Sequence, residues 1–268
     1  MVETAGIVGA FRRENTEKYE HTTRLKLFLF DIDGTLSTGG TFTGCLKKAL
    51  EETLGAEIRQ EQLDVQVKDG RNMREGVVEI LSGFGLRDAE CRKTAGSVID
   101  SATAYLKLEL AKSKVRPLEG VREFLDLLND KDYSALGIAT NNTLTVTRLK
   151  LASIGLLELF DSHDIIESGD TANDKCGIVK SAVSRAEKQL KARFGDGNVF
   201  YFGDQVSDIV AGKLAGVSSI GIANGKSSFE ELNGAGADAV FRSFSGAKPI
   251  LSFLSGNSSW KSMASKCY

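Results

Sequence analysis

The chain has 268 residues, of which 41% are hydrophobic and 26% charged, and its formal net charge at pH 7 is −2. That length allows one large domain or two modest domains with a substantial core. The charge is too small to favour nucleic acid or an acidic membrane as partner, and no apolar run approaches the roughly 18 residues of a membrane span.

Residues 1–24 form a polar extension ahead of the first predicted strand. Their charged residues interrupt any apolar run, so we expect no secretory signal. Arg12, Arg13 and Thr16 would suit a mitochondrial leader, but nearby glutamates weigh against one. The four cysteines are scattered without a close pair, which favours reduced thiols in the cytoplasm over a disulfide framework or a zinc site.

The most informative stretch reads Leu-Phe-Leu-Phe-Asp-Ile-Asp-Gly-Thr-Leu and spans residues 27–36. Its apolar run is typical of a buried strand, and the run ends directly in Asp31 and Asp33. Two neighbouring buried acids are costly unless they are paired or bind a cation, so a divalent metal and a phosphoryl group would suit them. The period of a strand would present Asp31 as a nucleophile and turn Asp33 elsewhere. A solvated Asp-Gly turn is the alternative interpretation.

The next segment, Thr35–Gly44, is rich in glycine and threonine and predicts a turn or flap. Residues 45–115 contain no convincing strand, and their apolar spacing predicts three helices. Pro117 marks a boundary and a favourable helix start. Strands and helices alternate beyond it, with strands predicted at 135–139, 164–167, 199–202, 218–223 and 239–241 and a long helix at 175–194.

This alternation implies a parallel sheet with helices on both faces. We therefore predict an α/β fold, a Rossmann-like parallel sheet core in three α/β/α layers, with an inserted α-helical cap domain. The expected divisions are an N-terminal extension at 1–24, the core at 25–40 and 116–250, the cap at 41–115 and a C-terminal tail at 251–268.

Polar residues follow three of the predicted strands, at the edge where open α/β sheets bind ligands. Lys175, at the start of a predicted helix, would also favour an anion. Each feature alone is commonly structural, and the ordered combination is what predicts one phosphoryl site. The residues are Asp31 and Asp33 after the first strand, Thr140, Asn141 and Asn142 after the second, and Asp204 and Asp208 after the strand at 199–202.

In this order the residues resemble the four motifs of the haloacid dehalogenase-like hydrolase superfamily, over roughly residues 25–245. The likeness is greatest to the phosphoglycolate phosphatase and small phosphatase branch, whose type 1 cap the helical insert matches. The matching residues are Asp31-Ile32-Asp33-Gly34-Thr35, Thr140, Lys175, and Gly203-Asp204 with Asp208.

The resemblance implies a phosphatase that uses Mg²⁺ and an aspartyl-phosphate intermediate to hydrolyse a small phosphorylated metabolite, phosphoglycolate or a sugar phosphate. Asp31 would be the nucleophile and Asp33 the general acid and base. Mg²⁺ would be held by Asp31, the backbone carbonyl of Asp33, and Asp204, with Asp208 as direct or water-linked support.

The resemblance also implies that Thr140, Asn141 and Lys175 bind the phosphoryl group. The third motif lacks the Lys-Pro dipeptide common in the nearest phosphatases, so Lys180 is a rival for the role of Lys175. Asp33 stands where dehalogenases usually carry an aromatic residue, which disfavours that chemistry. The flap, Leu36-Ser37-Thr38-Gly39-Gly40, lacks the Asp-Thr pair usual in the phosphomutases.

Substrate specificity should come from the cap. The segment 68–75 combines a glycine turn with Arg71 and Arg74, either of which could bind a substrate carboxylate or second anionic group. A solvated loop with an Arg–Glu pair is an equally good interpretation. We expect a monomer or weak dimer, and the alternative functions are a nucleoside monophosphate phosphatase and a catalytically idle protein that binds a phosphorylated ligand or a partner.

Overall fold

The structure, a computed structural model, describes residues 25–38, 41–64, 71–112, 116–130, 134–195 and 197–256. The predicted N-terminal extension, residues 39–40 of the flap, residues 68–70 of the arginine segment and the end of the predicted tail lie outside these ranges. Within them, every helix is too short or too polar to cross a membrane.

Six parallel strands form one sheet in the order β3-β2-β1-β4-β5-β6. β1 lies at the centre, paired with β2 on one side and β4 on the other, so Phe30 is opposite Ile138 and Phe202. The strands are β1 Lys26–Phe30, β2 Ser134–Ala139, β3 Ile166–Glu167, β4 Val199–Gly203, β5 Ser218–Ile222 and β6 Ala239–Phe241.

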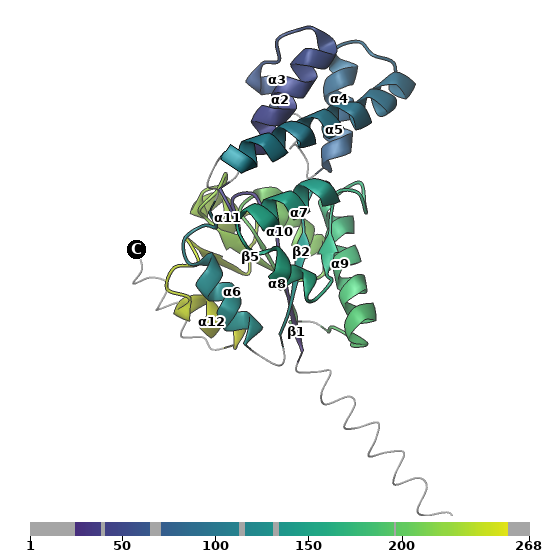
Figure 1. The fold of residues 1–268 in the computed structure, drawn as a ribbon. Coiled ribbons are helices and arrows are strands. Elements are labelled where there is room, and N and C mark those ends of the chain that lie inside the picture. Colours follow the sequence, from purple (N-terminus) through teal and green to yellow (C-terminus); the bar gives the residue numbers. More distant parts are fainter. Residues whose placement is uncertain are drawn as a thin grey trace, which may run out of the picture.

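Helices cover both faces of the sheet, which explains why its strands read as unbroken apolar runs (Figure 1). Phe28 and Phe30 point to one face and pack with α6, α8 and α12, whereas Leu27 and Leu29 point to the other and pack with α9. The predicted three-layer fold class is confirmed. The core helices are α6 Val121–Asn129, α7 Leu144–Ser153, α8 Leu157–Asp161, α9 Lys175–Leu190, α10 Val206–Ala215, α11 Phe229–Gly234 and α12 Lys248–Leu254.

The helices between β1 and α6 form the cap, which Figure 1 shows stacked on the end of the core that carries α7. They have a hydrophobic cluster of their own, and Val146 of α7 is buried in it. The cap therefore rests on α7. Its helices are α2 Thr41–Leu54, α3 Gln60–Asp64, α4 Met73–Gly83 and α5 Asp88–Lys112.

Three local expectations differ from the structure. α2 begins at Thr41, inside the predicted flap, and its apolar face packs against the other cap helices. Pro117 forms an isolated bridge with Ser37 instead of starting a helix, and α6 begins after Gly120. The expected division at 250/251 falls inside α12, since Leu254 is buried in the core.

Candidate active site

The predicted site residues meet at the carboxyl edge of the sheet. Asp31 follows β1, Thr140 follows β2 and Asp204 follows β4, the three adjacent strands at the centre of the sheet. Parallel strands in register deliver their last residues to the same edge, which is why sequence-distant side chains converge here. They line a cavity of about 480 Å³ whose other walls include Phe42 and Met73 of the cap.

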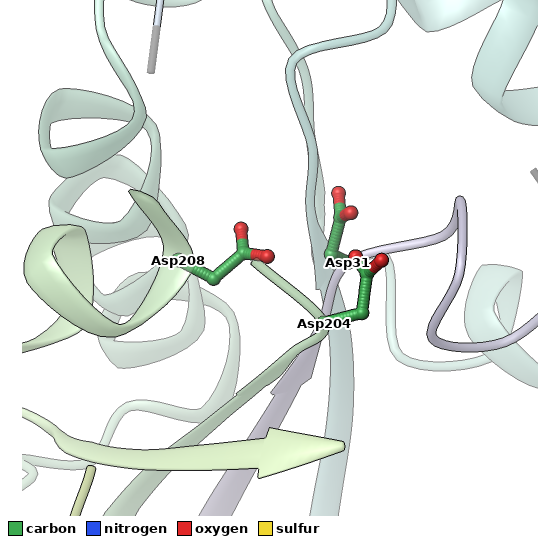
Figure 2. Close-up of side chains that lie close together, drawn as sticks. All are labelled: Asp31, Asp204 and Asp208. Atoms are coloured by element: carbon green, nitrogen blue, oxygen red, sulfur yellow. The ribbon is translucent and has the colours of Figure 1, made fainter. Parts of the chain in front are cut away.

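Three of the acids form a compact cluster, with carboxylate oxygens of Asp31, Asp204 and Asp208 within 4.8 Å of one another (Figure 2). All three are buried. Burial, together with the neighbouring negative charges, raises the pKa of Asp31 to about 6 and that of Asp204 to about 7. Three ionised carboxylates this close together repel one another, and a bound cation would offset that repulsion.

The cluster fits the Mg²⁺ that the family implies. Oδ1 of Asp204 is buried and has no hydrogen-bond partner among the described residues, so one acceptor in the cluster is left for a ligand. Oδ2 accepts from the backbone N–H of Lys226 at 2.9 Å, which fixes the carboxylate. Oxygen donors of this kind are those that Mg²⁺ prefers. Asp31, Asp204 and the backbone carbonyl of Asp33 would hold the ion.

Both carboxylate oxygens of Asp208 accept hydrogen bonds from other groups of the protein. Its Oδ1 accepts from the ammonium of Lys175 and from the hydroxyl of Tyr201 at 3.1 Å, and its Oδ2 accepts from the backbone N–H of Gln205 at 3.0 Å. Of the two roles expected for Asp208, direct ligand or water-linked support, these contacts favour the second. Asp208 also orients Lys175.

Lys175 is the lysine that the structure brings to the cluster. Its ammonium lies 3.4 Å from Oδ1 of Asp31 and contacts Asp208. Burial alone would lower its pKa, but Asp208 and Asp31 raise the pKa above its ordinary value, so it stays charged. Asp174 accepts from the N–H of Gly177 at 2.8 Å and caps the start of α9. Lys180, the predicted rival, is exposed one turn further on.

Thr140 and Asn141 lie where a phosphoryl group would need donors. Thr140 is buried near the Asp31 carboxylate, and its hydroxyl oxygen accepts from Nδ2 of Asn142 at 3.1 Å. Asn141 lines the cavity, and its carbonyl oxygen accepts from the N–H of Met73 at 3.2 Å, a contact between core and cap. Its side-chain Oδ1 is buried without a partner in the described part of the chain.

Asp33 also lines the cavity, but its partners differ from those of Asp31. Lys150 Nζ lies 2.7 Å from Oδ1 and 2.6 Å from Oδ2 of Asp33, and Asn142 Nδ2 lies 2.9 Å from Oδ2. Burial raises the pKa of Asp33, but Lys150 outweighs it and the pKa is lower than ordinary. Sequence reasoning missed Lys150, because nothing in the α7 pattern distinguishes it from a surface lysine.

The two candidate arginines occupy different places. Arg71 lines the cavity and pairs with Glu79 of α4. Arg74 is exposed on the first turn of α4 and lies beside Gly96 of α5, outside the residues that line the cavity. Of the two candidates, the geometry favours Arg71, because Arg74 lies toward α5.

The fold and the site define a capped α/β protein whose buried acidic cluster could hold a cation. The haloacid dehalogenase-like hydrolase family description matches residues 25–216, and the chain belongs to that family. The predicted resemblance is confirmed, and so is the expectation of an enzyme, since the family is one of hydrolases.

Similar proteins agree with this assignment. The chain is 26% identical over 208 residues to a phosphoglycolate phosphatase of Agrobacterium fabrum, covering 74% of this chain and 81% of the relative. It is also 26% identical over 222 residues to a phosphoglycolate phosphatase of Colwellia psychrerythraea, covering 82% and 93%. A hydrolase from Pseudomonas syringae has the same fold, with a TM-score of 0.66, 20% identity and coverage of 85% and 98%.

Proposed function

We propose that this hydrolase is a Mg²⁺-dependent phosphatase that acts on a small phosphorylated metabolite, with phosphoglycolate as the leading candidate. The observation that carries the proposal is the placement of Asp31. Its carboxylate lines the cavity, belongs to the acidic cluster and lies 3.4 Å from the ammonium of Lys175. Phosphoryl transfer needs a nucleophile, a cation site and a fixed positive charge close together in one cavity.

In the first step an oxygen of Asp31 attacks phosphorus, and the bond between phosphorus and the substrate oxygen breaks. Asp33, in the protonated form that its lowered pKa makes the minor one, gives its proton to the departing oxygen. In the second step water attacks phosphorus of the aspartyl-phosphate, Asp33 takes a proton from that water, and Asp31 is released with inorganic phosphate. Mg²⁺, when bound, would cancel the repulsion between the acids and the phosphate dianion.

The other cavity residues support an anionic phosphoryl group in this place. Lys175 neutralises charge next to Asp31, and Thr140 and Asn141 supply polar groups on the β2 side. The cap contributes Phe42 and Met73 to the lining, and apolar side chains there would help to exclude water from bound substrate.

The size and charge of the cavity support a small substrate with a second anionic group. A volume of about 480 Å³ suits a metabolite. Arg71 from the cap and Lys226 from the core both line it, in addition to the two buried lysines. Phosphoglycolate carries a carboxylate two bonds from its phosphoester oxygen, and both curated relatives bear its name.

The test is a panel of phosphoglycolate, sugar phosphates and nucleoside monophosphates, ranked by kcat/KM with Mg²⁺ and after its removal by a chelator. We expect phosphoglycolate to rank first and activity to vanish without the metal. Asp31→Asn should abolish turnover with an unchanged circular dichroism spectrum. If a sugar phosphate or nucleoside monophosphate ranks first, that compound replaces phosphoglycolate as the proposed substrate. If no compound is hydrolysed, the alternative of a catalytically idle binding protein is supported.

A further inference from the structure

The contact between Lys150 and Asp33 has no part in the steps above. Both oxygens of Asp33 lie within hydrogen-bond distance of the Lys150 ammonium, at 2.7 and 2.6 Å. Lys150 is 6% exposed, so its charge is withdrawn from water and depends on protein partners. Among the described residues those partners are Asp33 and Oδ1 of Asn142, which lies 3.3 Å away.

Asn142 completes a three-membered arrangement. Its Nδ2 donates to Asp33 at 2.9 Å while its Oδ1 faces the Lys150 ammonium. Two donors from different backbone positions therefore hold one carboxylate, which leaves that carboxylate little freedom to rotate. An acid and base must reach the departing oxygen within hydrogen-bond distance, so the orientation of Asp33 matters directly for proton transfer.

Lys150 also stands where the core meets the cap. It belongs to α7, whose Val146 is buried among the cap residues, and its ammonium lies 5.8 Å from the ring centre of Phe42 in α2. Phe42 and Lys150 line the same cavity. The cation is thus packed between the acid of the core and an aromatic residue of the cap.

We propose that Lys150, assisted by Asn142, is the positioning residue for Asp33. Lys150 acts through Asp33 and not on the substrate, because its ammonium is hydrogen-bonded to the two Asp33 oxygens. The charge next to the nucleophile comes from Lys175. The inference rests on the proposed function, since it assigns Lys150 to the acid and base of that reaction.

The choice of leaving group separates this role from a structural one. Phosphoglycolate releases an alkoxide, which needs a proton, whereas p-nitrophenyl phosphate releases a stable phenolate that does not. The value of kcat/KM reports the steps up to release of that group. We expect Lys150→Met to lower kcat/KM for phosphoglycolate by about 10²-fold and for p-nitrophenyl phosphate by much less.

Three variants complete the test. Lys150→Arg, which keeps a positively charged donor, should recover part of the loss. In an Asp33→Asn background Lys150→Met should cause no further loss, because the group through which it acts is already disabled. Arg148→Met is the matched control: Arg148 lies on the same helix and pairs with Asp161 at 2.9 Å, and we expect no change. If Lys150→Met does not fold, Asn142→Ala loosens the same carboxylate.

The outcomes separate the inference from the proposed function. An equal loss on both substrates, or a loss that adds to that of Asp33→Asn, would overturn the positioning role, and a raised KM with unchanged kcat would make Lys150 a substrate-binding residue. If the wild-type protein hydrolyses no phosphoester, the proposed function fails. Crystal structures of wild type and Lys150→Met then decide the inference, since an unmoved Asp33 side chain refutes it.

Discussion

Gly225 lies so close to Asp204 that a Cβ atom at position 225 would be 1.8 Å from Oδ2 of Asp204. No larger residue fits there without displacing the carboxylate. Gly34, on the other strand loop, approaches the same carboxylate: a Cβ there would come within 2.1 Å, and its φ of +81° already favours glycine. Backbone therefore encloses Asp204 on two sides. These two glycines, together with the backbone N–H of Lys226, set the position of the carboxylate in the acidic cluster.

Gly225→Ala should consequently displace Asp204 and weaken Mg²⁺ binding by at least about tenfold, while leaving the fold intact. Isothermal titration with Mg²⁺ measures the change in affinity directly. Gly195→Ala is the control, because nothing lies within 4 Å of a Cβ at that position. Equal Mg²⁺ affinity in both variants would mean that Asp204 tolerates the shift or does not hold the ion.

Local pattern was sufficient to predict most of the sheet and the position of Asp31 at a strand end. An apolar run that ends in Asp31 carries both pieces of information, because a strand buried on both faces has no polar alternation and must end where polarity begins. The same reasoning placed Thr140 and Asp204 at their strand ends. The parallel order then brought them together.

What the sequence could not give was the direction of individual side chains. Lys150 and Asp33 are 117 residues apart and meet only because α7 crosses over the strand ends. Arg71 and Arg74 looked equivalent, but the first precedes α4 and the second lies on its first turn, so they face different surroundings. Short helices such as α8 were missed because five residues contain too little periodicity.

The metal-free protein should lose stability as pH rises from about 4 to about 7. The pKa values of Asp31 and Asp204, about 6 and about 7, are higher in the folded protein than the ordinary 3.8. Over that interval the folded state holds protons that the unfolded state has released, so the free energy of unfolding falls with rising pH. Thermal denaturation in a chelator should show a falling Tm.

Adding Mg²⁺ should reverse this trend, because the ion binds the deprotonated carboxylates. The rise in Tm on adding Mg²⁺ should therefore be larger at pH 8 than at pH 5. Asp204→Asn should flatten the dependence near pH 7 in the chelator. A Tm that is insensitive to Mg²⁺ at both pH values would contradict the cation site.

Lys175→Met should destabilise the protein and disable it. Lys175 is buried between Asp31 and Asp208, and removal of one partner from a buried ion pair costs about 3–5 kcal/mol. Loss of the charge next to the nucleophile should also lower kcat by about 10²–10³-fold. Lys180→Met, at an exposed position of the same helix, should change the unfolding free energy by less than about 0.5 kcal/mol. Urea denaturation measures the free energy of unfolding of both variants. Similar values would mean that the ion pairs of Lys175 do not stabilise the fold.

Arg71→Ala should raise KM for phosphoglycolate more than for p-nitrophenyl phosphate. Arg71 lines the cavity from the cap side, where its guanidinium can bind the carboxylate of phosphoglycolate, and an aryl phosphate offers no such group. Arg74→Ala is the matched control, since Arg74 is exposed two residues into α4 and lies outside the cavity. Steady-state kinetics should show that Arg71→Ala raises KM for phosphoglycolate by about tenfold and that Arg74→Ala leaves KM unchanged. If both variants raise KM equally on both substrates, Arg71 contributes only general charge and another residue must bind the second anionic group. Lys226, which also lines the cavity, is then the next residue to substitute.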